Sequence, residues 1–282
     1  MKNLVIGTAI GYDTDDLKNF VLSFRACNSH DDVIIFLDQE SLYKSKEFLQ
    51  IFNIQTQLFD SLKYIQAISS TVLAFNMRFI RSYELLYNTD EYKHILISDV
   101  RDVVFQSNPF ENLPDEFLYL FSDDNYLSIE NNIYNNDWVL MNYPEFYNRL
   151  KSLPIICCGT IMGSKNQIMN CLRCMHEELM KLSNKNIPNM MLVDQAVLIF
   201  IAHMYPDHVL PRTIKINGDL VGTIGINCTT EFVLNRPRDL VRFDMGKVYI
   251  NDLCPAIIHQ YDRSPFLANF YNSFYSINKI IN

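Results

Sequence analysis

The chain alternates between short apolar runs and longer stretches in which apolar residues recur at helical spacing. Runs of strand length occupy residues 4–9, 32–37 and 95–97. The stretches between them predict helices at 14–27, with Thr14 as N-cap, at 41–52 and at about 70–87. Strands that alternate with helices form βαβ units, and right-handed crossovers join such units into a parallel sheet. We therefore expect an α/β fold.

The second half of the chain continues this pattern less regularly. We predict a strand at 117–121, a polar and aromatic loop at 122–137, a strand, bend and strand at 154–164, and helices at 165–182, 192–203 and 265–281. No repeat, low-complexity block or Pro/Gly/Ser-rich linker interrupts the sequence. Residues 1–282 are accordingly expected to form a single domain.

The composition excludes several classes of function. Hydrophobic residues make up 49% of the 282 residues and the net charge is −8, so a full core can form, and the sequence has no basic stripe of the kind that binds nucleic acid. The chain enters a strand-like run directly, and no apolar stretch approaches the length of a membrane span, so we expect a cytoplasmic protein. Seven cysteines without disulfide-framework spacing are expected to be reduced and mostly buried.

Two carboxylates follow the apolar run at 95–97, in the segment Ser98-Asp99-Val100-Arg101-Asp102. Ligands of open α/β sheets bind at the carboxyl ends of the strands, which is where this segment lies. Two like charges about 4 Å apart repel by roughly 4 kcal/mol at an effective dielectric of about 20, so the pair needs a counter-charge. That charge is a divalent cation or an arginine. The alternative is a turn-capping aspartate with one of the two carboxylates paired to Arg101.

A second apolar run ends in His259, within Ile257-Ile258-His259-Gln260-Tyr261-Asp262-Arg263. A histidine in this position is either structural or a third ligand beside Asp99 and Asp102. An oxygen-rich site with one imidazole suits Mn²⁺ or Mg²⁺ better than Zn²⁺.

Asp194-Gln195 and Arg78 are further candidates, each with two interpretations. Asp194 opens a predicted helix, so it is an N-cap, or with Gln195 it orients an acceptor hydroxyl and stabilises an oxocarbenium ion. Arg78 and Arg81 lie one turn apart, either on a solvated face or with an arginine clamped on a phosphate.

The first strand ends in the small, glycine-containing turn at residues 8–12, which would let a nucleotide approach the backbone closely. Neither G-x-G-x-x-G nor G-x-x-x-x-G-K-[ST] occurs, so no dinucleotide site or P-loop is indicated. The absence of G-x-S-x-G argues against a serine hydrolase.

Two cysteine motifs occur in the sequence, and neither is expected to form a metal site or to supply a nucleophile. Cys171 and Cys174 with His176 resemble half a zinc site, but their helical spacing favours core packing. The pair Cys157-Cys158 lacks an evident His/Asn arrangement, so it is not expected to supply a nucleophile.

Several segments, taken in order, resemble nucleotide-sugar-dependent glycosyltransferases of the GT-A fold, and the resemblance spans nearly the whole chain. Its strongest parts are D-V-R-D-V-V-F-Q at 99–106 and H-Q-Y-D-R at 259–263. The turn at 8–12, Arg78-Phe79 with Tyr83, Asn108-Pro109-Phe110, C-G-T-I-M-G at 158–163 and V-D-Q at 193–195 complete the set. The resemblance implies a Rossmann-like GT-A fold, with a central, mostly parallel mixed sheet flanked by helices.

The resemblance also implies a role for each candidate. Asp99, Asp102 and His259 would hold Mn²⁺ or Mg²⁺ against the donor diphosphate. Position 101 is Arg rather than a second Asp, which leaves open which carboxylates touch the metal; a turn is needed for Asp102 to reach it. Asp194 and Gln195 would be catalytic, and the donor would be bound by Thr8, Ala9, Gly11, Tyr12, Arg78, Gly159 and Thr160.

The expected function is metal-dependent transfer of a sugar from a nucleoside-diphosphate sugar to a glycan or another hydroxyl acceptor. A sugar nucleotidyltransferase is one alternative, but it should carry a basic residue in the loop after the first strand, and residues 8–12 have none. A catalytically silent carbohydrate-binding protein of the same fold is the other. The sequence leaves open the donor, the acceptor, the stereochemical outcome and the oligomeric state.

Overall fold

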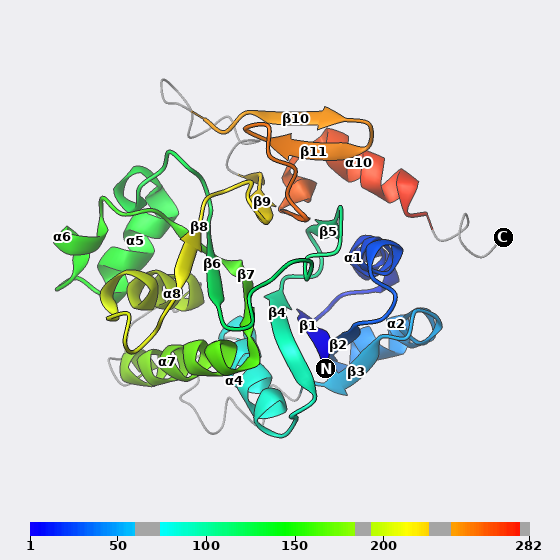
Figure 1. Cartoon of the computed structure of the whole chain (residues 1–282), viewed down its shortest axis with the longest axis horizontal. Helices are drawn as coiled ribbons and strands as arrows, with labels where there is room; N and C mark the ends of the chain where they lie inside the picture. The colour runs from blue at the N-terminus through cyan, green and yellow to red at the C-terminus, as the bar shows by residue number, and fades with distance from the viewer. Residues whose placement is uncertain (60–73, 184–192, 226–237, 277–282) are drawn as a thin grey trace.

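The computed structural model describes residues 1–59, 74–183, 193–225 and 238–276, and a seven-stranded sheet runs through its centre (Figure 1). The strand order is β3-β2-β1-β4-β7-β6-β8. The strands are β1 (Lys2–Ala9), β2 (Asp32–Leu37), β3 (Gln55–Leu58), β4 (Tyr92–Ser98), β6 (Leu118–Ser122), β7 (Ile156–Ser164) and β8 (Thr213–Lys215).

The sheet is mixed and mostly parallel, as expected. β1 pairs in parallel with both β2 and β4, β2 with β3, and β6 with β8, whereas β7 runs antiparallel to its neighbours β4 and β6. The carboxyl ends of β1, β4 and β6 consequently share one edge. The chain builds outward from β1 to β3 and then returns to add β4 on the other side of β1. This change of direction is a topological switch point, the usual place for a ligand crevice.

Helices cover both faces of the sheet. Successive residues of β1 enter different cores: Leu4 and Ile6 pack into one and Val5 into the other. The core that holds Val5 is closed by α1 (Thr14–Cys27) and α2 (Gln39–Ile51). The other lies under α4 (Ala74–Tyr87), α5 (Ile133–Asn142), α6 (Tyr147–Leu150), α7 (Lys165–Ser183) and α8 (Val193–Met204). Burial on both faces explains why the inner strands β1, β2 and β4 carry continuous apolar runs.

A small three-stranded sheet, ordered β5-β12-β9, brings the end of the chain to the switch point. β12 (Ile257–His259) runs antiparallel to β5 (Val103–Phe105) and parallel to β9 (Val221–Thr223), with His259 opposite Val103. The hairpin of β10 (Val241–Asp244) and β11 (Lys247–Ile250) packs with α10 (Pro265–Phe274) beside this sheet (Figure 1). The pairing of β5 with β12 therefore fixes where His259 lies.

Several predicted boundaries were wrong for local reasons. The N-cap of α1 is Asp13, not Thr14, because the Asp13 side chain accepts hydrogen bonds from the backbone N–H groups of Asp15 and Asp16, and Asp16 reciprocates in a capping box. Asp38 caps α2, which begins at residue 39 rather than 41. Asn132 caps α5, so residues 133–137 are helical rather than part of a loop.

The helix predicted at 265–281 ends at Phe274 in the structure. The strand, bend and strand predicted at 154–164 is one strand, β7, whose pairing with β6 is irregular between Leu120 and Phe121. The predicted residues 70–73, 192 and 277–281, and Cys228, lie outside the described residues. The six described cysteines are free, and four are buried. Within the described ranges, no helix is both long and apolar enough to cross a membrane.

Candidate active site

A cavity of about 630 Å³ opens at the edge where the carboxyl ends of β1 and β4 meet. The ends of β4 and β12, the bulged part of β7, and helices α4, α5 and α8 contribute the rest of its wall. Most of the residues predicted from the sequence line it: Thr8, Tyr12, Arg78, Asp99, Asp102, Gly159, Asp194, Gln195 and His259.

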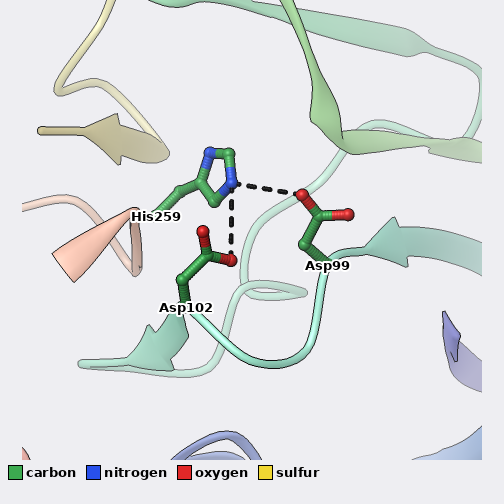
Figure 2. Close-up of side chains that lie close together, drawn as sticks. All are labelled: Asp99, Asp102 and His259. Carbon is green, nitrogen blue, oxygen red and sulfur yellow. Dashed lines mark ion pairs between the residues drawn. The ribbon is translucent and has the colours of Figure 1, made fainter. Parts of the chain in front are cut away.

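The two aspartates and His259 converge at the centre of this wall (Figure 2). The chain bends between the end of β4 and the start of β5, which supplies the turn that Asp102 needs to face Asp99. His259 Nε2 lies 3.4 Å from Asp99 Oδ2 and 3.8 Å from Asp102 Oδ1. One ligand atom from each residue lies within 4.8 Å of the other two.

The His259 ring is held from its other nitrogen. Nδ1 lies 3.4 Å from Cys157 Sγ and 3.5 Å from Thr223 Oγ1, while the buried Nε2 makes no well-formed hydrogen bond. Partners at Nδ1 fix the ring so that Nε2 is presented to the two carboxylates, the arrangement typical of a metal-ligating histidine. Two donors on opposite sides of an ion with bonds of about 2.1 Å lie about 4.2 Å apart. The three ligand atoms lie within 4.8 Å of one another, so they would have to approach one another only slightly to hold Mn²⁺ or Mg²⁺.

Arg78 links the metal-ligand group to the candidate catalytic carboxylate. Its Nη1 donates to Asp99 Oδ1, and its Nη2 lies 3.2 Å from Asp194 Oδ2. Arg101 pairs instead with Asp262, at 3.3 Å, and among the described residues no ion pair joins it to Asp99 or Asp102. The alternative in which Arg101 neutralises this pair is therefore not what the structure shows. Arg78 balances Asp99, and its second amino group is committed to Asp194.

The pKa values reflect this uneven balance of charge. Burial tends to raise the pKa of Asp99, but Arg78 and His259 hold it below its ordinary value. Burial and the Asp99 charge raise the pKa of Asp102. Burial tends to lower the pKa of His259, yet Cys157, Asp102 and Asp99 together raise it well above its ordinary value. A proton and a cation would therefore compete for His259.

Asp194 and Gln195 open α8 at the cavity. Burial raises the pKa of Asp194 despite the nearby Arg78. Asp194 Oδ1 accepts a hydrogen bond from the backbone N–H of Gln195 at 2.8 Å. Gln195 Nε2 donates to Asn135 Oδ1 at 2.7 Å, which turns the Gln195 carbonyl oxygen towards Cys158 Sγ, 3.6 Å away. The amide nitrogen thus faces α5 and the amide oxygen faces β7.

Three predicted donor-binding residues lie off the cavity wall. Ala9 and Thr160 are completely buried. Gly11 has a positive φ of 74° and donates its N–H to Asp38 Oδ2 at 3.1 Å, so it shapes the turn after β1. The cavity is bordered instead by Thr8, Ile10 and Tyr12 from the same segment.

Other residues at the site were missed. Cys157 has no evident His/Asn arrangement near it in the sequence, but the fold places it against His259. Burial raises the pKa of its thiol, which argues against a nucleophile. Asp123 follows β6, and burial raises its pKa to about 6. Its position at a strand end was the signal that could have found it. Trp138 lines the cavity from α5, and nothing in the sequence indicated this.

The architecture is that of GT-A glycosyltransferases. No protein-family model matches the sequence, and no curated protein sequence matches it. Among solved structures, the chain is similar to LgtC, in an active-site mutant with glutamate in place of glutamine: the TM-score is 0.56 at 12% identity, covering 96% of this chain and 94% of LgtC. Mouse xyloside xylosyltransferase 1, in its apo form, gives a TM-score of 0.50 at 12% identity, covering 92% and 97%. The predicted fold is thus confirmed over nearly the whole chain.

Gly159 provides a direct test of the site's geometry. A Cβ at this position would lie 2.4 Å from His259 Cε1 and 2.7 Å from Asp99 Oδ2. We predict that Gly159→Ala folds but binds Mn²⁺ at least about tenfold more weakly in calorimetric titration, because a shift worth about 1.4 kcal/mol suffices. Gly163→Ala, on the same strand, is the control: its Cβ would meet Phe117 O at 2.7 Å. That variant should lose thermal stability and keep its Mn²⁺ affinity; the reverse pattern contradicts the assignment.

The raised pKa of His259 predicts that protons compete with the metal. Only the neutral ring can ligate, so affinity should rise by about tenfold per pH unit up to the raised pKa and then level off, with about one proton released per ion. Titrations in two buffers of different ionisation enthalpy measure that release. His259→Gln should bind weakly with a flatter pH profile. A pH-independent affinity in the unmodified protein would exclude His259 as a ligand.

Proposed function

We propose that this protein is a metal-dependent glycosyltransferase that moves a sugar from a nucleoside-diphosphate sugar to a glycan or another hydroxyl acceptor, with residues 1–282 acting as one domain. One observation carries the proposal. In a GT-A fold, a buried histidine nitrogen without a well-formed hydrogen bond faces two carboxylates in the wall of a cavity at the switch point of the sheet.

The donor diphosphate is proposed to bind where the three ligands converge. Mn²⁺ or Mg²⁺ held there would supply positive charge to the leaving diphosphate. Arg101 and Arg263 line the same cavity, and both pair with the single carboxylate of Asp262, at 3.3 and 3.4 Å. These three side chains together carry one net positive charge. Guanidinium groups in such a position suit phosphate oxygens.

The remaining donor groups are assigned by their place on the wall. Thr8 and Tyr12, at the end of β1, border the space for the nucleotide, and Gly159 leaves room for the sugar beside His259. Arg78 reaches the cavity while holding Asp99 and Asp194. Its proposed role is therefore to fix both carboxylates and to contact the donor from the cavity wall.

Asp194 and Gln195 are proposed to act on the sugar and the acceptor. Cleavage of the sugar–phosphate bond leaves an oxocarbenium-like centre, which a nearby carboxylate and an amide oxygen stabilise. The cavity wall brings both side chains to the same space as the metal ligands. A glutamine also belongs to the active site of LgtC, where the solved mutant replaces it by glutamate.

The experiment that tests the proposal is a thermal-shift screen of UDP-, GDP- and ADP-linked sugars, with and without Mn²⁺. A ligand at 100 times its Kd stabilises the native state by about 2.7 kcal/mol, so one donor class should raise the melting temperature only when metal is present. Asp102→Asn should abolish that rise. Stabilisation with no sugar released to water or transferred would favour the silent carbohydrate-binding protein, and nucleotide-sugar synthesis from a sugar phosphate would favour the nucleotidyltransferase.

Asp194→Asn separates chemistry from donor binding. Because Asp194 does not belong to the metal-ligand group, we predict donor affinity within about threefold of the unmodified value and a turnover lower by about 10²–10³-fold. Asp207→Asn is the matched control, since that carboxylate is exposed and pairs with Arg212 on the surface. Unchanged turnover in Asp194→Asn would remove Asp194 from the reaction.

A further inference from the structure

Trp138 is the sole tryptophan of the chain, and it lies in the cavity wall on α5. It is partly exposed, so one part of the indole faces the cavity while the rest packs against the core. The Tyr134 ring, one turn earlier, lies against it with centroids 6.0 Å apart and planes inclined by 31°. The two rings give α5 a continuous aromatic surface that begins inside the cavity and ends at solvent, where Tyr134 is 55% exposed.

This surface is tied to the reacting centre by hydrogen bonds. Asn135 Oδ1 accepts from Gln195 Nε2 at 2.7 Å, and Asn135 Nδ2 donates to Asn132 Oδ1 at 3.1 Å. Asn135 and Trp138 are three residues apart on one helix and so share a face. The indole therefore lies at a fixed offset from the Gln195 amide.

The aromatic surface lies on the side of the cavity away from the nucleotide. Helix α5 packs on α8, beside β6 and β8, whereas β1 lies on the other side of β4 and β7 (Figure 1). A donor whose diphosphate rests on the Asp99 group and whose nucleoside follows the end of β1 leaves the α5 side free. That side, next to Asp194 and Gln195, is where an acceptor hydroxyl must approach.

The chemistry of this wall fits an uncharged sugar. The face of an aromatic ring is electron-rich and packs well on the C–H face of a pyranose, while nearby amides bond its hydroxyls. The polar side chains that α8 adds to the same cavity wall are the amide of Gln195 and the acidic Asp194, while the buried Asn135 holds the Gln195 amide from behind. Amides accept neutral hydroxyls, and the carboxylate disfavours an anionic acceptor.

We propose that Trp138 is the acceptor platform of this enzyme, stacking the pyranose ring of a neutral glycan so that its free hydroxyl meets the sugar held beside Gln195. This inference rests on the proposed function and adds the acceptor class and the residue that positions it. Trp138 binds the acceptor and takes no part in holding the metal or the donor diphosphate.

The lone tryptophan makes the platform directly observable. With Mn²⁺ and UDP or GDP present, titration with the methyl glycosides of glucose, galactose, mannose, xylose and N-acetylglucosamine, and with lactose, should change its fluorescence saturably for at least one neutral sugar. Glucuronic acid should give no such change. A flat response to every neutral sugar overturns the proposal, as does a preference for the acidic one.

Variants separate this inference from the function on which it rests. Trp138→Ala should raise the acceptor KM by at least tenfold, with donor affinity and metal-dependent donor hydrolysis within threefold of the unmodified values; Trp138→Phe, which keeps an aromatic face, should recover most of the loss. Phe266→Ala, at an exposed aromatic on α10, should leave all three quantities unchanged. An unchanged acceptor KM in both Trp138 variants overturns the platform alone. Absence of any nucleotide-sugar binding or hydrolysis in the unmodified protein overturns the proposed function instead.

Discussion

The organisation of the site depends on a partly exposed carboxylate, Asp99, a buried carboxylate, Asp102, and a buried imidazole, His259, whose Nε2 has no well-formed hydrogen bond. Arg78 balances Asp99, while Asp102 lies 3.8 Å from the Nε2 of His259, whose pKa Cys157, Asp102 and Asp99 together raise well above its ordinary value. Bringing these groups together requires the bend after β4, the pairing of β5 with β12, and a glycine at position 159 that leaves space for His259 and Asp99. The divalent cation that we propose would supply the charge that this arrangement lacks.

Arg78 contacts both the proposed metal site and the proposed reacting centre. One amino group holds the metal-site carboxylate and the other holds Asp194, so the geometry of the metal site and that of the reacting centre are coupled through one buried guanidinium. On the far side, the Asn135–Gln195 hydrogen bond extends the same chain of contacts to α5 and its aromatic surface. The side chains that we propose to position the donor, the reacting centre and the acceptor thus form a single connected set.

Features set by local sequence were predictable, and features set by distant contacts were not. Alternating periodicity identified the strands, and the rule that ligands gather at strand ends identified Asp99 and His259. The same rule applied to β6 would have found Asp123. In contrast, the contact of Cys157 with His259 joins residues 102 positions apart, and that of Gln195 with Asn135 joins residues 60 apart. Neither leaves a periodic or spacing signal. Ala9 and Thr160 were predicted to line the wall because the resemblance to GT-A enzymes placed their segments there. In the structure both side chains are completely buried in the core.

The most direct test of this account is the anomalous scattering of manganese in crystals grown with Mn²⁺ and a nucleoside diphosphate. The account predicts one ion bonded to His259 Nε2 and to at least one oxygen of Asp99 or Asp102, with the diphosphate completing its coordination. An ion and diphosphate bound elsewhere, with His259 and both aspartates still in contact only with each other and with Arg78, would contradict it.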